Sequence, residues 1–147
     1  MYVRELVVSY RTRSGVKTTV PRHSVRAPRE AAEVFTSILG EEAVEVFGIL
    51  CLSTKQHLIA YHQISRGLID QTLAGPREIF QVAMLANASG IVLGHNHPSG
   101  DPSPSPYDLV LTERLVKAGV VMGINVLDHI IVGHDGRYVS FKEGSRI

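Results

Sequence analysis

Residues 91–108 read IVLGHNHPSGDPSPSPYD, and this stretch decides both the fold class and the candidate function. An apolar run over residues 91–94 predicts a short buried strand that leads directly into His95, Asn96 and His97. Residues two apart on a strand point to the same face, so both imidazoles can leave the end of this strand on one side. The Pro-, Ser- and Gly-rich letters that follow predict a loop that returns the chain.

A helix is predicted to begin after this loop. Ser105 is a typical N-cap residue, Pro106 suits the first helical position, and Asp108 then lies in the first turn, where its carboxylate can face the strand end. Ser-x-x-Asp alone is also typical of a capping box, and His-x-His alone of a polar loop. Their conjunction after a buried strand indicates a metal site of His95, His97 and Asp108. Zinc held by three side chains keeps a fourth position open for water, as hydrolytic sites require.

Outward from this stretch, apolar periodicity and turn signals predict alternating strands and helices. We expect helices over residues 28–39, 76–88 and 106–118, and strands over residues 44–52, 58–65, 91–94, 126–132 and 138–141. The letters HDG at 134–136 predict the turn of the closing hairpin. This order indicates an α/β fold in which helices sandwich a mixed β-sheet.

Composition sets further bounds. The 147 residues suffice for one domain with a sizeable core, and a net charge of +1 gives no electrostatic argument for nucleic acid binding. Cys51 is the only cysteine, which excludes an internal disulfide and a cysteine-based zinc cluster, and its apolar surroundings predict a small buried hydrophobe. The chain shows no leader and no apolar run of membrane-spanning length, so we expect a cytoplasmic protein without a membrane partner.

Residues 1–27 form a basic N-terminal segment. The basic residues before Glu30 are Arg4, Arg11, Arg13, Lys17, Arg22, Arg26 and Arg29, with Glu5 as their only acidic neighbour. We expect an extended segment, with strands over residues 3–10 and 18–20, that belongs to the same domain as residues 28–147. The charges either guard a solvated strand edge or form an arm that binds phosphate or a partner.

The spacing His-x-His-Pro, loop, Ser-x-x-Asp resembles the signature of JAMM metalloproteases, also called MPN+ or JAB domains. The stretches most similar to the RadC-like branch of that family are residues 91–108, 75–78 and 127–131. The resemblance covers about residues 28–143. It implies the JAB/MPN architecture, which is cytidine-deaminase-like, and a zinc ion held by His95, His97 and Asp108.

The resemblance also implies a general-base glutamate on an early strand, and Glu45, followed by VFGIL, fits that pattern. Zinc lowers the pKa of its water to about 7, and a nearby carboxylate can then take the proton and pass it to the leaving amine. Glu41, Glu42 and Glu78 are competitors, but Glu45 heads an apolar strand, where an unpaired charge would be costly. Ser105 can cap its helix and, as the resemblance implies, stabilise the oxyanion of a tetrahedral intermediate.

The leading hypothesis is a zinc-dependent hydrolase of peptide or isopeptide bonds, with a peptide or protein as substrate. The alternative is a non-enzymatic module that is DNA-repair-associated or binds a protein partner. RadC-like proteins often carry a helix-hairpin-helix module ahead of this domain, and none is evident here, so nucleic acid has only the basic segment in its favour. A zinc deaminase needs Pro-Cys-x-x-Cys, which a single cysteine excludes.

Two polar positions near the candidate site have more than one interpretation. Asn96 stands where deubiquitinating relatives usually have Ser or Thr, which argues against a ubiquitin-like substrate. Asp128 and His129 lie in an otherwise apolar strand. They are either partners that support a metal ligand from behind or a satisfied polar pair in the core.

Overall fold

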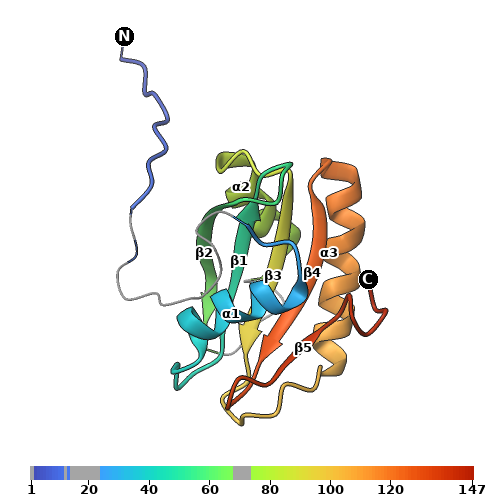
Figure 1. Cartoon of the computed structure of the whole chain (residues 1–147). Coiled ribbons are helices and arrows are strands. Elements are labelled where there is room, and N and C mark those ends of the chain that lie inside the picture. Colours follow the sequence, from blue (N-terminus) through green and yellow to red (C-terminus); the bar gives the residue numbers. More distant parts are fainter. Residues whose placement is uncertain (1, 12, 14–23, 68–73) are drawn as a thin grey trace.

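The computed structural model describes residues 2–11, 13, 24–67 and 74–147 (Figure 1). One five-stranded mixed sheet runs in the order β2-β1-β3-β4-β5, with helices on both faces. In chain order the elements are α1 (Pro28–Leu39), β1 (Val46–Leu52), β2 (Leu58–Arg66), α2 (Pro76–Leu85), β3 (Gly90–Asn96), α3 (Pro106–Met122), β4 (Asn125–Val132) and β5 (Tyr138–Ser140). The predicted α/β sandwich around a mixed sheet is confirmed.

Two apolar layers hold the helices to the sheet. On one face α1 packs over β3 and β4, with Phe35, Leu50 and Ile130 fully buried between them. On the other face α2 and α3 cover residues such as Ile49 and Leu93. Because side chains alternate between the faces of a strand, the central strands β1 and β3 are buried on both sides. The continuous apolar letters that predict these two strands follow from this burial.

Most predicted bounds lie within two residues of those in the structure, although α2 ends at Leu85 rather than at residue 88. The helix over 28–39 matches α1 at both ends, and β4 turns into β5 through Asp135 and Gly136, which both have positive φ angles of 55° and 72°. Strand β3 is longer than predicted and includes His95 and Asn96. His95 therefore lies within the sheet, where it pairs with Phe47 on β1 and Ile131 on β4.

The predicted end of the third helix at Gly119 is wrong. Helix α3 continues to Met122 and ends at Gly123, whose φ of 69° suits glycine. A Cβ on Gly119 would lie 2.5 Å from the backbone oxygen of Ile124. Glycine at 119 thus permits the chain to fold back closely against the helix rather than ending it.

The strand expected over residues 3–10 is also not observed. Residues 2–11 form no helix or strand and are exposed, and the strand expected over residues 18–20 lies outside the described residues. Among the described residues, Val25 is the first along the chain to be buried in the core, and its N–H donates to the oxygen of Gln56 at 2.8 Å. The boundary between residues 27 and 28 stays a prediction. Within the described ranges, no helix has the length and apolar composition needed to cross a lipid bilayer.

Candidate metal centre

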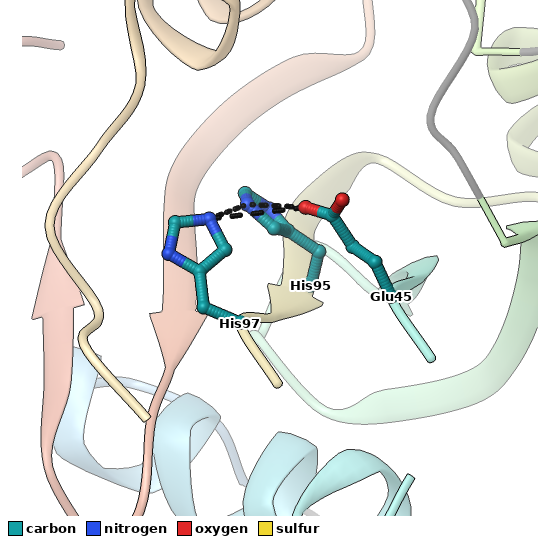
Figure 2. Close-up of side chains that lie close together, drawn as sticks. All are labelled: Glu45, His95 and His97. Atoms are coloured by element: carbon teal, nitrogen blue, oxygen red, sulfur yellow. Dashed lines mark hydrogen bonds and ion pairs between the residues drawn. The ribbon is translucent and has the colours of Figure 1, made fainter. Parts of the chain in front are cut away.

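The candidate site lies where β3 ends and β1 begins. These strands are antiparallel neighbours, so the residue just before β1 lies beside the end of β3. Figure 2 shows the result: the carboxylate of Glu45 points toward the rings of His95 and His97. The Nε2 atoms of the two histidines are 3.0 Å apart, and Glu45 Oε1 lies 3.6 Å from that of His95 and 3.8 Å from that of His97. Within the described part of the chain, these three residues form a group able to hold a metal ion.

Asp108 approaches the same two nitrogens from the first turn of α3. Its Oδ1 lies 3.4 Å from His95 Nε2, and its Oδ2 lies 3.5 Å from His97 Nε2. The carboxylate is 2% exposed and is held by the cap of its own helix, because Oδ2 accepts the N–H of Ser105 at 2.8 Å. The structure therefore brings together all three side chains that the sequence predicts as ligands, and Glu45, the expected base, lies beside them.

Electrostatics keep the Asp108 carboxylate ionised. Its burial opposes the charged form, but the neighbouring imidazoles of His95 and His97 outweigh this cost and hold the pKa of Asp108 well below its usual range. The pKa of His97 is raised, chiefly by its hydrogen bond with Asp108 and against the effect of burial. The cluster therefore presents a fixed negative charge to any cation placed between the rings.

The His97 ring has a defined orientation. Its Nδ1 lies 2.8 Å from the backbone oxygen of Asp101, in the loop after β3. A carbonyl oxygen only accepts, so Nδ1 carries the proton and donates it. In the neutral ring Nε2 then carries a lone pair, which faces His95, Glu45 and Asp108. This arrangement is the usual one for an imidazole that binds a metal.

The donor set fits zinc. Donors placed about 2.0–2.1 Å from a tetrahedral ion are about 3.3 Å from one another. The distances that join the two imidazole nitrogens to each other and to Asp108 are 3.0, 3.4 and 3.5 Å. Two imidazoles and one carboxylate match the ligand types of hydrolytic zinc sites.

Both carboxylates reach both imidazoles, so distance alone does not decide which is the third ligand. Their surroundings differ. Asp108 is buried and anchored by the helix cap, whereas the side chain of Glu45 is 27% exposed. A metal ligand benefits from a rigid side chain, whereas a general base that passes protons benefits from access to solvent. This difference favours Asp108 as the third ligand and Glu45 as the neighbouring base, and both roles stay predictions.

The competing glutamates have other surroundings. Glu42 forms an ion pair with Arg66 at 2.7 Å, and Glu78 lies in the first turn of α2. Ser105 caps α3 as predicted, since its Oγ accepts the N–H of Asp108 at 3.1 Å. Accepting that bond is compatible with donating the hydroxyl proton to an oxyanion. The role of Ser105 in catalysis stays a prediction.

Asn96 has a contact that the sequence analysis missed. Its Oδ1 accepts the N–H of Val46 at 2.7 Å, and its Nδ2 donates to the oxygen of Val44 at 2.9 Å. The amide thus brackets Glu45 on both sides and holds the segment that carries it. The signal was available, because a polar side chain between two histidines at the end of a buried strand points to the opposite face and needs its own partners.

The fold and this cluster define a JAB-type α/β domain with a candidate metal centre. The chain belongs to the RadC-like JAB domain family, whose model matches residues 25–146.

The relatives carry the name UPF0758 protein. One from Alkaliphilus oremlandii is 42% identical over 131 residues, which cover 89% of this chain and 56% of that protein. One from Methanosarcina barkeri is 40% identical over 123 residues, 84% of this chain and 53% of its own length. One from Pelobacter propionicus is 44% identical over 117 residues, 80% of this chain and 51% of its own. The chain thus spans about half the length of these relatives.

Proposed function

We propose that this chain is a zinc-dependent hydrolase of peptide or isopeptide bonds. The observation that carries the proposal is the convergence of His95 Nε2, His97 Nε2 and the Asp108 carboxylate within 3.5 Å of one another, with a second carboxylate beside them. A binding scaffold has no need of that second carboxylate, whereas a hydrolase does. Zinc held by the first three residues would supply a water of lowered pKa and polarise the substrate carbonyl.

The remaining steps belong to the protein's own side chains. Glu45, the more exposed of the two carboxylates, takes a proton from the attacking water and later delivers it to the leaving amine. Ser105, at the N-terminus of α3, donates its hydroxyl proton to the oxyanion that develops on the substrate carbonyl. Among the described residues Glu45 forms no ion pair with lysine or arginine. Ser105 Oγ accepts the N–H of Asp108, a role that uses its oxygen and leaves the hydroxyl proton available.

The alternative is a non-enzymatic module that binds DNA or a protein partner. Its support is the basic segment before Glu30, whose described residues 2–11 are exposed. A net charge of +1 for the whole chain argues against strong phosphate binding. A DNA affinity that drops steeply between low and moderate salt, in a protein that binds no zinc, would favour this module over the hydrolase.

The decisive experiment compares three variants of the full chain for bound zinc and for cleavage of a library of fluorogenic peptides and isopeptides. We expect Asp108→Asn to lose zinc and all turnover. Glu45→Gln should retain zinc and lose turnover by a factor on the order of 10²–10⁴, which is the usual contribution of a general base. Glu41→Gln is the matched control, because Glu41 is an exposed glutamate in the turn after α1, and it should behave as wild type.

The outcomes separate the roles of the two carboxylates. If Glu45→Gln lost zinc and Asp108→Asn retained it, Glu45 would be the third ligand and Asp108 the base. Full turnover in Glu45→Gln would remove Glu45 from the mechanism. A wild-type protein that binds no zinc would refute the hydrolase itself.

A further inference from the structure

A second line of buried polar groups lies behind His95, on the ring nitrogen that faces away from the cluster. His95 Nδ1 lies 2.8 Å from Nε2 of His129 on β4. His129 Nδ1 lies 2.6 Å from Oγ1 of Thr112 on α3, and that oxygen lies 2.6 Å from the backbone oxygen of Asp108. Thr112 and both rings are buried. A continuous chain of hydrogen bonds, which we call the His129–Thr112 relay, thus joins two of the three proposed ligands.

Only one placement of protons satisfies this relay when the rings are neutral. The Asp108 carbonyl can only accept, so the Thr112 hydroxyl donates its single proton there. Thr112 Oγ1 must then accept from His129 Nδ1–H. A neutral imidazole carries one proton, so His129 Nε2 is an acceptor. His95 Nδ1 must therefore be the donor.

The surroundings of His129 keep its ring neutral. The ring is fully buried, stacked on Phe141 at 4.7 Å between centroids, with Phe47 edge-on at 5.8 Å. Placing a charged imidazole between two aromatic rings and away from water would be costly, so this packing favours the neutral ring. A charged His129 would donate from both nitrogens and reverse the proton on His95, so burial is what gives the relay its direction.

We infer that Thr112 and His129 are positioning residues that hold His95 in the tautomer with its proton on Nδ1. In that tautomer the lone pair of Nε2 faces His97 and Asp108, ready for a cation. The inference deepens the proposed metal function and rests on it for its purpose. Without the relay, a neutral His95 would also populate the form protonated on Nε2, which must move that proton before it can bind a metal.

The sequence allowed two interpretations of Asp128 and His129, and this assignment gives the two residues different roles. His129 supports a proposed ligand from behind. Asp128 does not reach the His129 ring: its carboxylate accepts the hydroxyl of Ser140 at 2.6 Å, the N–H of Lys142 at 2.9 Å and the backbone N–H of His129 at 2.7 Å. Asp128 therefore fastens the turn after β5, which places Phe141 against the His129 ring.

The direct test reads the tautomers in the metal-free full chain. Two-bond ¹H–¹⁵N correlation spectra, recorded above the ordinary histidine pKa of about 6.5, distinguish Nδ1–H from Nε2–H rings. We expect the Nδ1–H form for both His95 and His129. A His95 found mainly as the Nε2–H form would overturn the inference, whether or not the protein binds zinc.

The second measurement is zinc affinity, by competition with a chromophoric chelator. Thr112→Val keeps the shape of the side chain and removes its hydroxyl, so we expect the Nε2–H form of His95 to appear and affinity to weaken on the order of 10–100-fold. Thr112→Ser should restore most of both. Thr36→Val, the same change in α1 on the opposite face of the sheet, is the matched control and should alter neither.

The two proposals fail separately. If the wild-type protein binds no zinc but His95 carries its proton on Nδ1, the relay stands and the hydrolase is refuted. If zinc binds and Thr112→Val affects neither the tautomer nor the affinity, the relay is refuted and the metal site stands. Because His129 is fully buried, the isosteric change at Thr112 is the safer perturbation of the two.

Discussion

The amide of Asn96 offers a sharp test of how the site is held. Replacing Asn96 by Ala removes the acceptor of the Val46 N–H and the donor to the Val44 oxygen. Val46 is fully buried, so its N–H would lose its partner without gaining water. Leaving one such group unsatisfied costs about 1–3 kcal/mol. The Val44 oxygen belongs to an exposed residue and can turn to solvent, so it adds little.

We therefore expect Asn96→Ala to lower the free energy of unfolding by about 2 kcal/mol. For a domain of this size that corresponds to a drop in Tm of about 4–8 °C. Urea unfolding followed by circular dichroism measures the change directly. The matched control is Asn125→Ala, an exposed asparagine at the start of β4, which should stay within about 0.5 kcal/mol of wild type.

A positioning role for Asn96 predicts more than a loss of stability. The backbone around Glu45 would lose its two hydrogen bonds with Asn96, at Val44 and Val46. Turnover under folding conditions should therefore fall while bound zinc persists. Asn96→Asp sharpens the test, because a carboxylate would face the Val44 oxygen and be stable only when protonated. The folded-state pKa of that carboxyl would be raised, so the variant should recover stability as the pH falls. An Asn96→Ala protein as stable as the Asn125→Ala control would refute this reasoning.

Three further predictions concern packing and reactivity. Gly94→Ala should destabilise the fold by about 1–3 kcal/mol, because the new Cβ would lie 2.3 Å from the Phe35 ring. Phe35→Leu should recover part of this loss, measured as a double-mutant cycle by urea unfolding. Gly119→Ala should destabilise by a similar amount in the same assay, because its Cβ meets a backbone oxygen at 2.5 Å that cannot move aside as a side chain can; a neutral result would show that the α3–β4 turn relaxes. Burial raises the pKa of Cys51 to about 11, so the folded protein should resist alkylation by iodoacetamide at neutral pH and react only at its rate of unfolding; modification as fast as that of a free thiol would contradict its buried position.

The sequence predicted best the elements that have a clear apolar periodicity or clear starting and ending residues. Helix α1 has Pro28 at its start and a clear apolar stripe, and its bounds were predicted to the residue. The end of α3 was not, because Gly119 looks like a helix terminator in the letters alone. Glycine is needed there because the backbone oxygen of Ile124, beyond the helix, lies too close to leave room for a Cβ atom. That contact depends on tertiary structure. Likewise, residues 3–10 have strand-like composition, but no described neighbour pairs with them.

The same division holds for the site. The two histidines and Asp108 could be predicted because strand and helix geometry alone bring such residues to one place. The role of Thr112 could not be predicted, because its hydroxyl reaches His129, at 2.6 Å, only when α3 and β4 pack together. The sequence shows which side chains are able to bind a metal. The contacts that orient them arise from packing between elements distant along the chain.

The tripeptide His95-Asn96-His97 connects the two halves of the site through the period of a β-strand. His95 and His97 point to the side where α3 presents Asp108, at 3.4 and 3.5 Å. Asn96, one position between them, reaches instead to the segment before β1 and fixes the backbone around Glu45. A shift of β3 by one residue would exchange these roles and place an amide where an imidazole must be. The register of β3 between β1 and β4 therefore sets the proposed ligands and the proposed base together, and a polar residue between the two histidines follows from that geometry.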